Sequence, residues 1–277
     1  MEKNCAILVM SCDAYSDLWH DFFVLKNRNW TDCPFPTYLI TNNKICEEDN
    51  VKTICCGDKL NWTGRLLYAL EKISANYIFL LLEDYYISTP VNNDTINEIL
   101  FFIEQKSVSY YKLEERANLN AGHYEGSKYL KKVDGSVEYG ISLITSIWNV
   151  EFLKQVIGGE DYPAWEFEVR RNMDDDITHK LDALCLVDNR NVLNITHMVQ
   201  RGKYIPKGLR KLKKLGYPIN TDNRGKLSAF FSLYLKLYKR MRKSPHVFNL
   251  IRKAQHLCGF KSVSDKYMDE IKQNKYK

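Results

Sequence analysis

The alternation of short apolar runs with amphipathic segments in residues 5–106 constrains the fold more than any other feature of this chain. The strand-like runs are CAILVMSC (5–12), FPTYLITNN (35–43), VKTICCG (51–57) and YIFLLLEDYYIS (77–88). The helix-like segments are DAYSDLWHDFFVLKN, NWTGRLLYALEKISAN (61–76) and NNDTINEILFFIEQK (92–106). We expect Asp13 or Ser16 to cap the first helix and Asn93 or Asp94 to begin the third. Strands that alternate with helices predict an α/β fold, with a mostly parallel sheet flanked by helices.

The run YIFLLLEDYYIS passes from an apolar strand directly into two adjacent carboxylates. In a parallel sheet the ligand binds outside the carboxyl ends of the strands. This rule places the polar residues that end successive strands along one rim of the sheet. Those residues are Ser11, Asp13, Asn42, Asn43, Glu83 and Asp84.

The regular alternation weakens after residue 106. Residues 107–140 are polar and rich in tyrosine, and within them AGHYEGSKYLKKVDGS (121–136) indicates a loop or hairpin. Residues 137–157 return to a strand followed by a helix. ALCLVDN and NVLNITHMVQRGKYI read as short closing strands. We therefore divide the chain into a first domain, residues 1–205, and a basic helical C-terminal region, residues 206–277.

Several classes of protein lack support in this sequence. No GxGxxG, GxxxxGK[ST] or GxSxG motif is present, which argues against a Rossmann cofactor site, a P-loop and a nucleophile-elbow hydrolase. No signal peptide and no apolar stretch of roughly 20 residues is visible. The eight cysteines form no CxxC pair, so we expect free thiols in a reducing, cytoplasmic compartment.

Glu83 and Asp84 are the first candidates for chemistry. Carboxylates at the end of a central strand can hold Mg²⁺ or Mn²⁺, and substrate phosphates can complete the coordination shell. Tyr85, which follows them, could line the same pocket. The alternative is a strand end that simply reaches solvent, where acidic residues are common.

A second candidate is GGEDYPAWEFE, in which carboxylates surround aromatic side chains. Desolvation beside an aromatic wall raises the pKa of a carboxyl group toward that of a general base. Glu168, Glu166 and Asp161 are the candidate bases, and Trp165 offers an aromatic face to a sugar. The alternative is the acidic first turn of a helix, where carboxylates complement the macrodipole.

Three further residues could contact a diphosphate or its metal. His197 in NITHMVQRGKY is a candidate metal ligand with Asp84, and Lys203, with Arg201, could clamp a diphosphate. Arg65 in NWTGRLLYAL lies at a helix start that we expect near the same rim. The alternative for His197 is a histidine that is satisfied within the core.

Taken together, these segments resemble bacterial GT-A-type glycosyltransferases of capsule and lipopolysaccharide clusters. The resemblance covers about residues 5–205 and is carried by ILVMSCDAYSDLW, NWTGRLLYAL, YIFLLLEDYYISTPV, ISLITSIWNVEFL and AWEFEV. It implies transfer of a sugar from a nucleotide donor, a UDP-sugar first among them, to a hydroxyl of a glycan or lipid-linked acceptor. The family's D-x-D metal motif is replaced here by L-E-D-Y, which leaves dependence on a divalent cation open.

The resemblance also implies roles for particular residues. Donor contacts fall to Ser11, Asp13, Asn42, Arg65, Glu83, Asp84, Tyr85 and Lys203. Glu168, Glu166 or Asp161 would be the base of an inverting enzyme, whereas a retaining enzyme needs no such base. Trp148 and Trp165 would face the acceptor.

The charge is distributed unevenly along the chain. Residues 201–277 carry a net charge of +17, whereas residues 1–200 carry −11. In residues 225–253 apolar residues recur at helical spacing among lysines and arginines, which is typical of a helix that lies on an anionic membrane surface. The alternatives are packing on the first domain, contact with a second copy of the chain, or binding of a protein or nucleic acid.

Three functions follow from these patterns. The first is a metal-assisted glycosyltransferase at the inner face of the cell membrane. The second is a nucleotidyl- or phosphotransferase on a similar sheet. The third is a non-catalytic module that binds carbohydrate or nucleic acid, against which the acidic pair Glu83–Asp84 argues.

Overall fold

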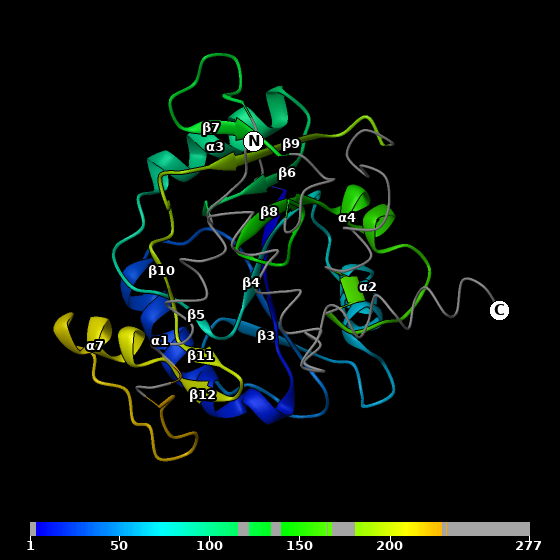
Figure 1. Ribbon diagram of the computed structural model, residues 1–277. Helices are drawn as coiled ribbons and strands as arrows, with labels where there is room; N and C mark the ends of the chain where they lie inside the picture. The colour runs from blue at the N-terminus through cyan, green and yellow to red at the C-terminus, as the bar shows by residue number, and fades with distance from the viewer. Residues whose placement is uncertain are drawn as a thin grey trace, which may run out of the picture.

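The computed structural model describes residues 4–115, 122–133, 140–164, 166–167, 181–228 and 231. Within them, an eight-stranded sheet runs in the order β3-β2-β1-β4-β8-β6-β9-β7 (Figure 1). Its strands are β1 (Cys5–Met10), β2 (Thr37–Thr41), β3 (Val51–Cys55), β4 (Tyr77–Leu82), β6 (Val108–Lys112), β7 (Leu130–Lys132), β8 (Ser146–Asn149) and β9 (Leu184–Asp188). All run parallel except β8 and β7.

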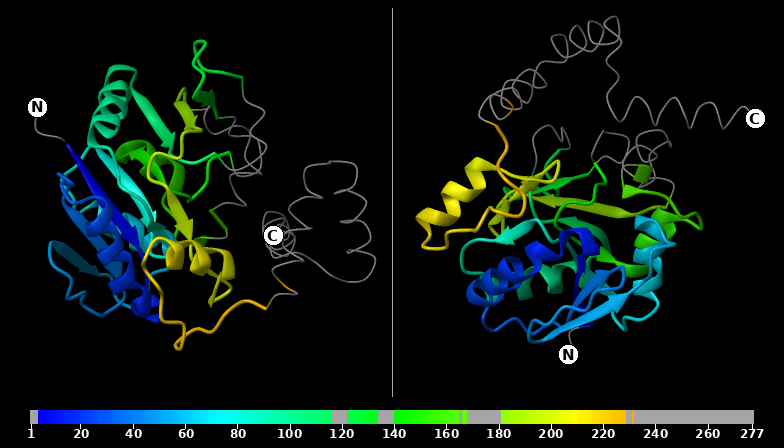
Figure 2. Two further views of the ribbon diagram at one scale, coloured as in Figure 1. Left: turned by 90° about the vertical axis from the view of Figure 1, so that its left-hand side faces the viewer. Right: turned by 90° about the horizontal axis from the view of Figure 1, so that it is seen from below.

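Helices cover both faces of this sheet. On one face lie α1 (Trp19–Asn29) and α3 (Asn93–Gln105), and on the other lie α2 (Trp62–Leu70) and α4 (Val150–Ile157) (Figure 2). Alternate residues of β1 separate the two cores: Ile7 and Val9 pack with α1, whereas Ala6, Leu8 and Met10 pack with α2. The predicted fold class, a mostly parallel α/β sheet flanked by helices, is confirmed.

The structure also corrects several local predictions. A 3₁₀ helix, η1 (Asp13–Leu18), precedes α1, and neither begins with a side-chain cap. The cap of α3 is Asn92, whose side chain accepts a hydrogen bond from the Thr95 amide. The expected helix over 61–76 ends at Leu70. No strand was predicted over residues 108–112, where VSYYK forms the interior strand β6. In the described part of residues 121–136, an antiparallel bridge joins His123 and Lys131, which agrees with the hairpin predicted there.

The run YIFLLLEDYYIS is not one strand. β4 ends at Leu82, and Tyr85–Ile87 forms β5, which pairs antiparallel with β10 (Ile195–His197) outside the main sheet. Glu83 and Asp84 occupy the turn between them. The two carboxylates therefore lie where the chain leaves the central sheet.

The first part of the basic C-terminal region packs on the first domain. The helix α7 (Pro206–Lys214) follows the hairpin of β11 (Val199–Gln200) and β12 (Lys203–Tyr204), and Leu212 joins the core formed by α1 and α3. Farther along, Leu227 is buried and its amide donates to the Tyr204 carbonyl. The boundary predicted at residue 205 thus falls inside a packed segment, while most of the predicted helix over 225–253 lies outside the described residues. In the part of the chain that the structure describes, no helix is long and apolar enough to cross a bilayer.

Candidate functional site

The carboxyl ends of β1, β2 and β4 lie side by side and form one rim of the sheet, because these strands are parallel and adjacent. Ser11 follows β1, Asn42 follows β2, and Glu83 follows β4. The sequence predicted this juxtaposition from strand ends alone. The rim is where a ligand binds in an open α/β sheet.

Asp13 and Asn42 form reciprocal hydrogen bonds. The Asp13 carboxylate accepts hydrogen bonds from the backbone amides of Asn42, Asn43 and Lys44 at 3.0–3.2 Å. The Asn42 side-chain oxygen accepts in turn from the Asp13 amide at 3.1 Å. These bonds shape the loop after β2, so in this structure both predicted donor contacts are used to fix the rim itself.

His197 reaches the rim through the ribbon of β5 and β10. In that ribbon His197 pairs with Tyr85, and the Met198 amide donates to the Asp84 carbonyl at 2.8 Å. The imidazole Nε2 then lies 3.0 Å from Oδ2 of Asp84, although the two residues are 113 positions apart. The two residues predicted to bind metal are therefore brought into direct contact.

Tyr85 orients this pair. Its ring stacks on the His197 ring with centroids 4.7 Å apart and an interplanar angle of 21°, and its own side chain is buried. The stacked ring restricts rotation of the imidazole and leaves one edge of it toward Asp84. Tyr85 thus lines the site, as predicted from its position after the acidic pair.

Glu83 is buried, with 8% of its surface exposed. Burial and the neighbouring charge of Asp84 raise its pKa to about 8, although Arg224 and Arg65 oppose this shift. At neutral pH the Glu83 carboxyl therefore holds a proton.

The raised pKa of Glu83 predicts a pH-dependent stability. The folded protein keeps the proton that the unfolded chain loses near the ordinary pKa of 4.5, so this stabilisation is lost as pH rises toward about 8. The free energy of unfolding of Glu83→Gln, taken relative to that of the wild type, should rise by about 1–3 kcal/mol as the pH is raised from about 5 to about 9. Urea unfolding across this range measures the gain, with Glu71→Gln, at an exposed position, as the control. Parallel pH profiles for wild type and Glu83→Gln would contradict the assignment.

Arg65 reaches the rim from α2. Its Nη1 donates to the Ser11 carbonyl at 2.8 Å, and its Nε is buried with no hydrogen-bond partner. Ser11 accepts a second bond, from Trp19 Nε1 to its hydroxyl, at 2.7 Å. Among the described residues no carboxylate forms an ion pair with Arg65, which leaves its charge available to an anionic ligand.

The donor set suits a cation that is shared with a phosphorylated ligand. Asp84 offers a carboxylate and His197 an imidazole nitrogen, both of which bind Mn²⁺ in proteins. Over the described ranges no group of three or more His, Cys, Asp or Glu could hold a metal by itself. Phosphate oxygens and water would have to supply the other ligands.

Asp161 has a structural role. Its carboxylate accepts from the backbone amides of Asn61 and Gly64, both at 2.9 Å, and so caps the first turn of α2. A Cβ on residue 64 would lie 2.6 Å from Oδ1 of Asp161, so a larger residue there would displace the Asp161 carboxylate. These bonds also bring the segment around Asp161 to the end of α2 that carries Arg65.

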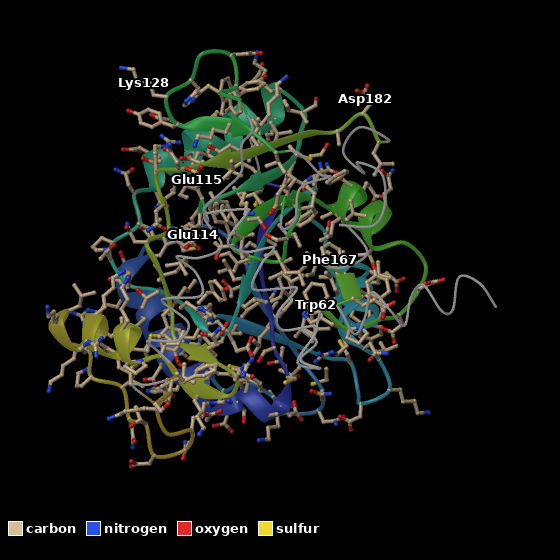
Figure 3. The ribbon with its side chains drawn as sticks, viewed as in Figure 1. Trp62, Glu114, Glu115, Lys128, Phe167 and Asp182 are labelled. Carbon is tan, nitrogen blue, oxygen red and sulfur yellow. The ribbon has the colours of Figure 1, made fainter. Side chains whose placement is uncertain are left out.

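The other predicted base candidates are only partly described. Glu166 is half-buried, and its amide donates to the Pro163 carbonyl at 3.0 Å. The next residue, Phe167, packs on Trp62 with ring centroids 6.1 Å apart (Figure 3). Glu168 and Trp165 lie outside the described residues.

The prediction that Trp148 faces the acceptor is wrong. Its side chain is fully buried, its ring lies 4.3 Å from that of Tyr110, and its Nε1 donates to the Ser146 hydroxyl. Residue 148 alternates onto the inner face of β8, beneath α4, so the tryptophan fills the core. The apolar segment ISLITSIWNVEFL does not indicate which face of the strand a helix will cover.

Lys203 lies in the hairpin that follows His197, with its side chain exposed. Arg201, at the turn of the same hairpin, places its guanidinium 4.9 Å from the Phe231 ring. This hairpin begins at Val199, two residues after His197, so Lys203 and Arg201 lie on the segment next to the site. The structure shows no contact between these cations and the acidic pair.

Two residues that the sequence did not single out border the acidic pair. The field of Glu83 is the second cause, after burial, of the raised pKa of Tyr15, and Arg224 lowers the pKa of Glu83. Tyr15 follows a strand end, a position that could have marked it. Arg224 gave no signal, because it lies in a tail that reads only as basic.

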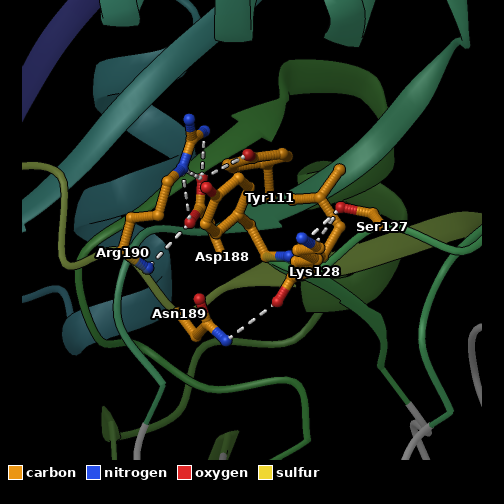
Figure 4. A network of polar contacts seen from close by, with 8 residues as sticks. Tyr111, Ser127, Lys128, Asp188, Asn189 and Arg190 are labelled. Carbon is orange, nitrogen blue, oxygen red and sulfur yellow. Dashed lines mark hydrogen bonds and ion pairs between the residues drawn. The ribbon is translucent and has the colours of Figure 1, made fainter.

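A second buried polar cluster lies farther along the sheet, at the end of β9. Asp188 is fully buried, accepts from the Tyr111 hydroxyl at 2.7 Å, and pairs with Arg190, whose Nη2 lies 2.6 Å away (Figure 4). The Asn189 side chain donates to the Lys128 carbonyl. This cluster fixes the hairpin around β7 on the far part of the sheet.

Comparison with known proteins gives structural similarity without sequence similarity. No protein-family model matches the chain, and no curated protein matches it significantly. Among solved structures, S. aureus TarS aligns with a TM-score of 0.47 and 12% identity over 87% of this chain and 44% of TarS. TarS 1–349 in complex with UDP-GlcNAc aligns with a TM-score of 0.43 and 12% identity, over 87% of this chain and 73% of that one.

The chain spans little more than half of another structure of TarS 1–349, 55% of its length, with a TM-score of 0.39 and 11% identity over 61% of this chain. Similarities this weak do not establish a shared function.

Proposed function

We propose that this protein is a glycosyltransferase that takes a sugar from a nucleotide-diphosphate donor. The observation that carries the proposal is the contact between Asp84 and His197, 3.0 Å apart at the end of the central strand β4. A carboxylate and an imidazole in contact at the ligand-binding rim, beside an arginine without an ion pair, suit a diphosphate and its cation.

In this proposal each residue of the rim has a distinct task. Asp84 and His197 would hold a divalent cation, which would stabilise the charge of the departing nucleotide diphosphate. Arg65 would contact the diphosphate directly, since its Nε is buried without a partner. Glu83, which is buried and protonated, would keep the site from carrying two adjacent negative charges.

The acceptor would approach from the side of residues 160–168. Glu168, Glu166 and Asp161 are the candidates for the base of an inverting reaction, and of these Asp161 also caps α2. Such a base would remove the proton from the acceptor hydroxyl while its oxygen attacks the anomeric carbon. The bond from that carbon to the diphosphate oxygen breaks in the same step.

A ligand screen on the wild-type protein tests the proposal. A ligand that binds the folded state alone raises the melting temperature. We expect UDP to raise it, and to do so more in the presence of Mn²⁺, when UDP, GDP, CDP and CMP are compared with and without the ion. Release of UDP from UDP-sugars then identifies the donor. If no nucleotide raises the melting temperature under any of these conditions, the proposal is wrong and a non-catalytic binding module is favoured.

We also propose that the C-terminal region binds an anionic membrane surface. Residues 201–228 hold nine Lys or Arg and one Asp, and among the described residues none of the eight exposed cations has an ion-pair partner. Each cation near such a surface contributes about 1 kcal/mol. We expect the full chain to sediment with phosphatidylglycerol vesicles and less with phosphatidylcholine vesicles. Equal sedimentation with both would contradict the proposal.

A further inference from the structure

We propose that Arg224 is a positioning residue of the donor site, which holds the turn Asp13–Leu18 in the shape that a nucleotide requires. The inference rests on the proposed function, since it assigns a role within the same rim. Arg224 comes from the C-terminal segment, 207 positions from the residue it pairs with. The site would then be completed by a part of the chain that the sequence assigned to a separate region.

The guanidinium of Arg224 makes several contacts with one turn. Its Nε donates to Oδ2 of Asp17 at 2.6 Å, and its Nη2 donates to the other oxygen of that carboxylate. Nη2 also donates to the Ala14 carbonyl at 2.8 Å. Its Cζ lies 4.2 Å from the centroid of the Tyr15 ring. Arg224 thus contacts three residues of η1, through two hydrogen bonds to the Asp17 side chain, one to the Ala14 backbone and one cation–π contact with Tyr15.

The turn η1 is the part of the rim that follows β1 directly. Just before η1, Arg65 donates a hydrogen bond to the Ser11 carbonyl. The first residue of η1, Asp13, accepts a hydrogen bond from the Asn42 amide in the loop after β2. Arg224 holds the remaining residues, from Ala14 to Asp17. A short 3₁₀ helix with no side-chain cap has little stability of its own, so these external contacts determine its shape.

The segment that carries Arg224 is itself anchored at both ends. The Tyr217 hydroxyl donates to Oδ1 of Asp21 at 2.9 Å, and the Tyr204 amide donates to the Gly225 carbonyl. The Arg224 side chain is 9% exposed, compared with 20% for Asp17. A buried, bidentate ion pair between two anchored segments has a defined geometry, unlike a pair on the surface.

The chemistry of the contact requires arginine. A lysine could reach one oxygen of Asp17 but could not bind both oxygens in parallel and the Ala14 carbonyl at the same time. The effect of Arg224→Lys therefore separates charge from geometry. If charge alone mattered, lysine would restore the wild-type behaviour.

The test measures donor binding and the turn itself. Arg224→Gln should raise the KM for the nucleotide sugar by about tenfold while kcat changes by less than about threefold, as expected when ground-state and transition-state binding are lost equally. Arg224→Lys should be intermediate. Asp17→Asn should add little to Arg224→Gln, because both substitutions break the same contact. Asn223→Ala, at an exposed position next to Arg224, is the matched control and should behave as wild type.

Hydrogen exchange of the amides in residues 13–18 supplies a readout that needs no nucleotide. Exchange should accelerate in Arg224→Gln, less so in Arg224→Lys, and not in Asn223→Ala. Unchanged exchange in Arg224→Gln, an unchanged KM, or full rescue by lysine would overturn the inference. If the wild type binds no nucleotide, the proposed function and the donor-site role fail together, and exchange then decides whether Arg224 positions the turn at all.

Discussion

Replacing Asp84 by asparagine is expected to lower the rate of sugar transfer by about 100- to 1,000-fold, an effect of the size seen when a group that stabilises developing charge is removed. The substitution keeps the size of the side chain and its contact with His197, which lies 3.0 Å away. It removes the negative charge that would hold the cation on the donor diphosphate. Steady-state rates of UDP release, at saturating donor and Mn²⁺, measure the loss.

The pair at Asp84 and His197 should behave as one unit. His197→Gln should lower the rate substantially, and the double variant should be little worse than Asp84→Asn, since residues in direct contact are not additive. Glu48→Gln is the matched control, because Glu48 makes a comparable contact with His20, at 2.7 Å, on the exposed surface. A rate for Asp84→Asn within about threefold of the wild type would remove Asp84 from the mechanism.

Replacing Asp188 by alanine is expected to lower the free energy of unfolding by about 3 kcal/mol, near the lower end of the range for broken buried ion pairs. Asp188 is fully buried, and its loss leaves the buried Tyr111 hydroxyl without its acceptor and Arg190 without its counter-charge. Arg190 is partly exposed, with 33% of its side chain accessible, which limits the penalty. Urea unfolding measures the difference.

An exposed ion pair provides the comparison for Asp188→Ala. Glu151 and Lys154 are three residues apart on α4, with nitrogen and oxygen 2.8 Å apart, and their side chains are 73% and 36% exposed. Glu151→Gln should change the free energy of unfolding by less than about 0.5 kcal/mol. If Asp188→Ala costs no more than Glu151→Gln, the cluster at the end of β9 does not stabilise the fold.

Much of the sheet could be predicted from local pattern. Apolar runs such as CAILVM and YIFLLL are buried on both faces, as expected for central parallel strands. The polar residues that end them were correctly placed on one rim. β6 was missed because VSYYK is short and lies in a polar context, although Tyr110 and Tyr111 are fully buried.

The site itself was predicted in part. Asp84 and His197 were both named from the sequence as candidate metal ligands, and they lie in contact. The sequence could not show that β5 and β10 would bring them together. Asp161 and Trp148 were chosen for chemistry that suits them, yet one caps α2 and the other fills the core. A carboxylate and a tryptophan serve either purpose equally well, and burial decides between them.

The sequence by itself determined the α/β fold class and the position of the acidic pair at a strand end. Periodicity and strand ends are local properties, because each residue's environment follows from its neighbours along the chain. Only the tertiary structure decided that His197 meets Asp84 and that Arg224 meets Asp17, 207 positions away. Such contacts depend on strand register and on which surfaces become buried together, and these are properties of the whole packed chain.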